Sequence, residues 1–147
     1  MCGWRRPEAR GGGATITGRC QCGAVLWRLD GDIAFINHCH CSICRRIHGT
    51  AFGTFAHGAA AAFHWVRGDS AIARYESSPG VFRCFCRVCG SQVPVIEDDE
   101  VCIPAGGIDG DPGTRPSLHI FVGSKAAWHE ITDPLPQFAA FPPDDEA

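Results

Sequence analysis

The sequence predicts a mainly β fold, built from short antiparallel strands with little helix. Six segments are short, apolar or alternating, and rich in branched or aromatic residues, which is typical of β-strands. These predicted strands span residues 24–29, 34–37, 51–56, 71–76, 81–85 and 118–122. Turn-forming residues separate them, most clearly in Asp30-Gly31-Asp32, Arg67-Gly68-Asp69 and Ser78-Pro79-Gly80.

One helix is expected, and it is short. It runs from Ser42 to about His48, because the Ser42 hydroxyl can cap a first turn and Gly49 can end the last one.

The length and composition fit a single domain. With 147 residues, 45% of them hydrophobic, the chain can bury one core but not two. We expect a disordered leader at residues 1–13, one folded domain at 14–142 and a flexible tail at 143–147, because both ends are polar and the first is rich in glycine.

Charge and targeting signals argue against nucleic-acid and membrane partners. The net charge is −3, and the 13 basic residues are scattered along the chain, so a basic binding surface is not expected. No apolar stretch reaches the roughly 20 residues needed to span a bilayer, and no apolar signal segment is visible. The sequence therefore predicts a cytoplasmic protein whose thiols stay reduced, which favours metal binding over disulfides.

Eight of the ten cysteines lie in three close-spaced clusters. The clusters are Cys20-x-Cys22, Cys39-x-Cys41-x2-Cys44 and Cys84-x-Cys86-x2-Cys89. Residues two apart on a strand point to the same face, so a C-x-C pair on a bent strand can direct both sulfurs toward one ion. Zinc accepts thiolates in a tetrahedron, and the sequence predicts two zinc ions per chain.

The first and third clusters together predict a structural zinc site. Cys86-x2-Cys89 followed by Gly90 resembles half of a zinc ribbon, because the glycine permits the turn that carries the ligands. Cys20 and Cys22 would complete four thiolates, and a site with four protein ligands is closed and structural.

The middle cluster leaves two interpretations open. Three thiolates from Cys39, Cys41 and Cys44, with a water or substrate as the fourth ligand, would make a catalytic zinc site. Their combined charge weakens the acidity of bound water and favours chemistry on thiols. A fourth protein ligand would instead make the cluster structural, and the candidates are His38, His40, His48, Cys84 and Cys102.

Residues near the middle cluster are weaker candidates. Arg45 and Arg46 could bind a carboxylate of glutathione or a similar thiol substrate, although a solvated helix face is the simpler expectation for either. Cys84 could reach the second zinc, although a small buried apolar role is preferred. Trp128 is expected to pack in the core.

The chain resembles the glutathione-dependent formaldehyde-activating enzyme (GFA) family, whose domain is shared with centromere-protein-V-like proteins. The resemblance runs from about Thr17 to Pro142. It is carried by four separated motifs in order, at residues 18–23 (GRCQCG), 39–46 (CHCSICRR), 85–91 (FCRVCGS) and 119–131 (HIFVGSKAAWHEI). Cys84 is a departure, because the family pattern does not require a cysteine there.

The resemblance implies a β-tent fold with zinc knuckles and two zinc ions. It assigns Cys20, Cys22, Cys86 and Cys89 to a structural zinc and Cys39, Cys41 and Cys44 to a catalytic zinc. It also implies a carbon–sulfur lyase that condenses glutathione and formaldehyde into S-hydroxymethylglutathione, with a small-molecule thiol as its partner. The alternative that the same resemblance allows is a non-catalytic zinc module that binds another protein.

Overall fold

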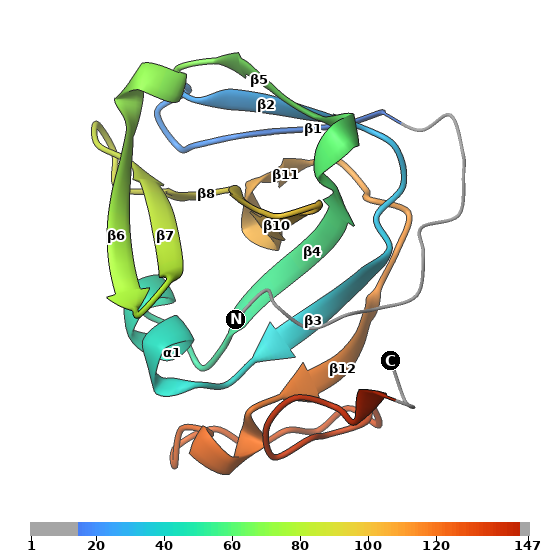
Figure 1. Ribbon diagram of the computed structural model, residues 1–147. Coiled ribbons are helices and arrows are strands. Elements are labelled where there is room, and N and C mark those ends of the chain that lie inside the picture. The colour runs from blue at the N-terminus through green and yellow to red at the C-terminus, as the bar shows by residue number, and fades with distance from the viewer. Residues whose placement is uncertain (1–14, 145–147) are drawn as a thin grey trace.

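A computed structural model describes residues 15–144 of the chain (Figure 1). The predicted leader at residues 1–13 and the end of the predicted tail, residues 145–147, lie outside the described residues. The strands are β1 (Thr15–Arg19), β2 (Leu26–Asp30), β3 (Phe35–Cys39), β4 (Gly53–Ala59), β5 (Phe63–Arg67), β6 (Ile72–Ser78), β7 (Val81–Cys86), β8 (Gln92–Val93), β9 (Val95–Glu97), β10 (Glu100–Pro104), β11 (Ile108–Asp109) and β12 (Pro116–Ile120). The helices are α1 (Ser42–His48) and four 3-10 turns, η1 (Ala60–Ala62), η2 (Asp69–Ala71), η3 (Ala105–Gly107) and η4 (Val122–Ser124).

The strands form three small sheets, so the mainly β prediction is confirmed. Their orders are β11-β1-β2-β5, β12-β3-β4-β10-β9 and β6-β7-β8. Each pair in the described range is antiparallel except β12 with β3, which is parallel. A parallel pair needs a long connection, and here the connection from β3 to β12 contains most of the fold (Figure 1).

The predicted strands each overlap an observed one, but strands β1, β5 and β8–β11 were missed. The predicted helix is also present and ends at Gly49, whose φ is 63°. Its N-cap was wrong: the Cys41 side chain, rather than the Ser42 hydroxyl, accepts the capping hydrogen bond from the Cys44 N–H. The cap residue therefore comes from the cysteine triad itself.

The buried residues form three clusters, and two of them contain predicted metal ligands. One cluster surrounds Trp27 and Leu29 beneath the first sheet. A second includes the three cysteines of the middle cluster, and the third packs Cys20, Cys84 and Cys86 against Val25 and Val93. Trp128, expected in the core, is 75% exposed. No helix in the described range is long and apolar enough to cross a membrane.

Candidate metal centres and the adjoining pocket

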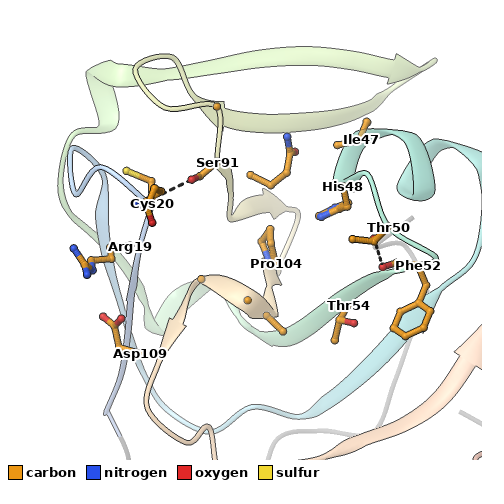
Figure 2. Close-up of a pocket in the computed structure, with 16 residues that line it drawn as sticks. Arg19, Cys20, Ile47, His48, Thr50, Phe52, Thr54, Ser91, Pro104 and Asp109 are labelled. Carbon is orange, nitrogen blue, oxygen red and sulfur yellow. Dashed lines mark hydrogen bonds between the residues drawn. The ribbon is translucent and has the colours of Figure 1, made fainter.

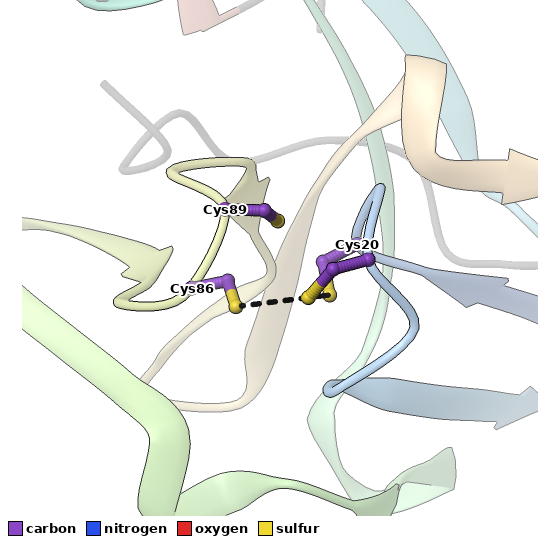
Figure 3. Close-up of side chains that lie close together, drawn as sticks. Cys20, Cys86 and Cys89 are labelled. Atoms are coloured by element: carbon purple, nitrogen blue, oxygen red, sulfur yellow. Dashed lines mark hydrogen bonds between the residues drawn. The ribbon is translucent and has the colours of Figure 1, made fainter.

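Four cysteines from two distant turns come together in space (Figure 3). Cys20 and Cys22 lie in the turn after β1, Cys86 ends β7, and Cys89 lies in the turn between β7 and β8. Their four sulfur atoms all lie within 4.8 Å of one another. We refer to these residues as the four-cysteine group.

The spacing of these sulfurs suits a tetrahedral zinc ion. Zinc–sulfur bonds of about 2.3 Å place neighbouring sulfurs about 3.8 Å apart in a tetrahedron. The Cys20 and Cys22 sulfurs are 3.6 Å apart, and the Cys22 and Cys86 sulfurs are 3.9 Å apart. The donor set and its size therefore both fit the ion.

The turns that carry the four-cysteine group direct backbone N–H groups toward sulfur. The Val25 N–H donates to Cys20 Sγ at 3.3 Å, and the Ala24 N–H donates to Cys22 Sγ at 3.5 Å. The second turn closes with a hydrogen bond from the Gly90 N–H to the Cys86 carbonyl, at a φ of 81° that glycine tolerates without strain. Such donors favour the thiolate form that binds metal.

The second group is the triad of Cys39, Cys41 and Cys44, whose sulfurs also lie within 4.8 Å of one another. Cys39 ends β3, Cys41 caps α1, and Cys44 lies in the first turn of that helix. All three side chains are buried. Within residues 15–144, no other cysteine, histidine, aspartate or glutamate belongs to this group, so the described part of the chain offers three ligands here and four at the other group.

Without metal, the triad concentrates negative charge on one sulfur. Hydrogen bonds from the Cys39 and Cys44 thiols lower the pKa of Cys41 to about 2. The interaction with Cys41 raises the pKa of Cys39. For Cys44, the hydrogen bond with Cys39 lowers the pKa, but Cys41 and burial outweigh it and raise the pKa to about 11. The triad therefore holds one thiolate and two thiols near neutral pH, and a divalent cation would displace two protons.

A buried arginine contacts the triad. Arg83 lies on β7 and is 6% exposed, and its Nη1 donates to Cys44 Sγ at 3.5 Å. Sequence spacing could not predict this contact, because Arg83 and Cys44 are separated by 39 positions and lie in different elements. An arginine within an otherwise apolar strand next to cysteines was the one feature that could have drawn attention to it.

A chain of hydrogen bonds runs from His40, which lies between Cys39 and Cys41 in the sequence, to the partly exposed Asp133. His119 Nε2 lies 3.0 Å from the Asp133 carboxylate, and His40 Nε2 lies 2.8 Å from His119 Nδ1. With the carboxylate accepting from His119, His119 Nδ1 is the acceptor and His40 Nε2–H the donor. His40 is fully buried, its pKa is lowered by burial to about 4, and its Nδ1 has no hydrogen-bond partner. His40, a candidate fourth ligand of the middle cluster, does not belong to the group of sulfurs in the described residues.

A pocket of about 620 Å³ adjoins the four-cysteine group (Figure 2). Arg19 and Asp109 lie on one side, and His48, Phe52 and Thr54 lie on the opposite side. Cys20 of the four-cysteine group also lines it. No cysteine of the triad lines the pocket. Two lining residues are near neighbours of the triad: His48 ends the helix that carries Cys44, and the ring centroids of Phe52 and His40 are 5.0 Å apart.

Three other predicted candidates lie apart from this pocket. Arg45 Nε donates to the Ser124 carbonyl at 3.2 Å, and Arg46 is exposed. Neither arginine lines the pocket. Cys84 is 9% exposed and belongs to neither metal group, so the preferred prediction of a buried apolar role is confirmed.

Comparison with known proteins agrees with the family resemblance found in the sequence. The model of the family described as glutathione-dependent formaldehyde-activating enzyme matches residues 15–124. The chain belongs to this family. A GFA relative from Halomonas elongata is 32% identical over 127 residues, which cover 79% of this chain and 80% of the relative. The name of that relative assigns it, provisionally, as a glutathione-dependent formaldehyde-activating enzyme.

A solved structure supports the fold alone. The crystal structure of a Rhodobacter sphaeroides protein superposes with a TM-score of 0.55 at 24% identity. The match covers 65% of this chain and 89% of the other.

The match to the GFA family model includes both cysteine groups, since Cys20 to Cys89 lie within residues 15–124.

Proposed function

We propose that this protein is a zinc-dependent carbon–sulfur lyase-like enzyme that acts on a thiol adduct. The observation that carries the proposal is the gathering of the Cys39, Cys41 and Cys44 sulfurs within 4.8 Å of one another in a chain of the GFA family. In this proposal the four-cysteine group holds a structural zinc, and the triad holds a catalytic zinc. The family name supports glutathione and formaldehyde as the reactants, and S-hydroxymethylglutathione is the product that we propose for them.

The charge of the triad favours sulfur chemistry over water activation. Three thiolates around a divalent cation leave a net charge of −1, which makes bound water less acidic than at a site of neutral histidines. When bound there, zinc would supply a soft centre for a substrate sulfur and hold it as a thiolate. The surrounding chain contributes burial, because all three cysteines are nearly inaccessible to solvent.

The pocket has the size and polarity for a small peptide-like thiol. Its volume of about 620 Å³ lies within the range of roughly 300–1,000 Å³ typical of small-molecule sites. Its polar wall offers charged groups of both signs, from Arg19 and Asp109, to a substrate that carries both amino and carboxylate groups. These features support a thiol such as glutathione as the substrate.

Metal analysis combined with one substitution tests the proposal. The purified protein should contain two zinc ions, and Cys41→Ser should lose one of them together with turnover of glutathione and formaldehyde. Cys84→Ser is the matched control, because it replaces a buried thiol outside both groups and should keep both ions and full turnover. If Cys41→Ser folds and retains wild-type turnover, the triad is not the catalytic site. If the zinc-loaded wild type turns over no thiol–aldehyde pair, the lyase assignment is wrong.

A further inference from the structure

Arg83 is a buried cation in the middle of β7, and its hydrogen-bond partners are few. Its Nε donates to Ser77 Oγ at 3.2 Å, and its Nη1 donates to Cys44 Sγ at 3.5 Å. Its Nη2 is buried and has no hydrogen-bond partner. A side chain whose only role was to stabilise the fold would be expected to satisfy this donor, because an unpaired buried donor is costly.

The charge of Arg83 also needs a counter-charge. A guanidinium removed from water is strongly destabilised unless an anion lies beside it. In residues 15–144 no carboxylate forms an ion pair with Arg83. Arg83 instead contacts Cys44, which is a thiolate once the triad binds a divalent cation.

The charges balance when the triad holds a metal. Three thiolates and one divalent cation sum to −1, and the guanidinium brings the buried assembly to neutrality. A neutral assembly is much less costly to bury than a charged one. His48 lines the large pocket, and together with Arg83, whose Nη2 has no partner, it also lines a small cavity of about 20 Å³. A space of this size holds one small polar group such as a water or a hydroxyl.

We propose that Arg83 is a positioning residue of the triad. When a metal is bound there, Nη1 pairs with the Cys44 thiolate, and Nη2 is offered to an oxygen atom of the bound substrate. The second contact rests on the proposed function, and the first does not. In the addition of a thiolate to an aldehyde, the sulfur lone pair forms the new sulfur–carbon bond. The π pair of the carbonyl then moves onto oxygen, which takes a proton from water to become the hydroxyl. The hydroxide that remains is neutralised by the proton that the thiol lost on becoming a thiolate. The Nη2 donor stabilises the negative charge that this oxygen carries before protonation.

Metal affinity tests the first contact without any substrate. In Arg83→Met, the second zinc equivalent should bind about 10- to 100-fold more weakly by competition with a chromophoric chelator, the range expected for loss of a charged hydrogen bond. The first equivalent, at the four-cysteine group, should be unchanged and reports that the variant has folded. Arg83→Lys keeps the charge and should bind both equivalents within about threefold of wild type.

The matched control is Arg74→Met, which removes another arginine of the same sheet. Arg74 lies over the Phe82 ring, 3.9 Å from its centroid, and is exposed, so both zinc affinities should stay at the wild-type values. Unchanged affinity of the second equivalent in Arg83→Met would overturn the first contact. An equal loss in Arg83→Lys and Arg83→Met would overturn charge balance as its cause.

Kinetics of the zinc-loaded lysine variant test the second contact. A compact ammonium lacks the forked donors of a guanidinium, so Arg83→Lys should lower kcat at least tenfold with little change in the KM for the thiol. Wild-type kcat in this variant would overturn the contact between Nη2 and the substrate oxygen. A wild-type protein that is inactive on every thiol–aldehyde pair would refute the proposed function, while the affinity measurements would still decide the role of Arg83 at the triad.

Discussion

The four-cysteine group should act as a cross-link, and a single substitution can show it. Cys86→Ser removes one ligand from the group, and Cys84→Ser makes the same chemical change two residues earlier on the same strand. Both cysteines are buried, at 0% and 9% exposure. Only Cys86 belongs to a metal group, so the difference between the two variants isolates the contribution of the metal to stability.

The expected magnitude follows from the length of chain that the group closes. Cys22 and Cys86 are 64 positions apart, and their sulfurs lie 3.9 Å from each other. Cross-linking a loop of this length lowers the entropy of the unfolded chain by the equivalent of about 4 kcal/mol at 25 °C. Domains of this size are stable by about 5–15 kcal/mol, so the loss would be a large share of the total. It corresponds to a fall in melting temperature of roughly 10 °C.

Urea denaturation of the zinc-loaded proteins, followed by circular dichroism, measures the effect. Cys86→Ser should lose about 4 kcal/mol relative to Cys84→Ser, and a chelator should destabilise Cys84→Ser much more than Cys86→Ser. Equal unfolding free energies for the two variants would refute the cross-link. A chelator that destabilised both variants by the same amount would also refute the cross-link. The stabilisation by metal would then come from a site other than the four-cysteine group.

Two further predictions concern the triad and the first sheet. Because Cys39 and Cys44 hold protons near neutral pH while the pKa of Cys41 is lowered to about 2, zinc should displace two protons there. The affinity for the second zinc equivalent should therefore rise about 100-fold per unit of pH between 6 and 8. A competition titration that gave a rise of about 1000-fold per unit of pH would mean three displaced protons and would contradict the thiolate at Cys41. Gly18→Ala should lose about 3 kcal/mol in urea denaturation, since its Cβ would lie 2.0 Å from the buried ring of Trp27; a loss below about 1 kcal/mol would contradict this packing.

The sequence predicted the parts of the fold that depend on local pattern. Alternating and branched residues located strands such as β3, β7 and β12, and the glycine at position 49 correctly marked the end of α1. Strands such as β5 and β10 were missed because they are short and carry charged or aromatic residues that do not alternate clearly. The parallel pairing of β12 with β3 depends on where the intervening chain packs, which local pattern does not specify.

The same division applies to the site. The two cysteine groups could be proposed from spacing and resemblance, since the members of each cluster are close in sequence. Arg83 and Asp133 could not, because each reaches its partner from a distant element. Cys41 shows a third case, in which the helix N-terminus was located correctly but the cap was assigned to Ser42, because a sulfur acceptor is not among the usual capping groups.

Strand β7 connects the two cysteine groups, and this makes their stabilities dependent on each other. Arg83 and Cys86 are three positions apart on it, and residues an odd number apart on a strand face opposite sides. One side therefore contacts the triad through Cys44, while the other side supplies a ligand to the four-cysteine group. The four-cysteine group fixes the end of β7 against the turn after β1. It therefore also holds Arg83 at the distance where its charge reaches Cys44. Loss of the four-cysteine group should then weaken metal binding at the triad although the two share no ligand, and this coupling is carried by the strand itself.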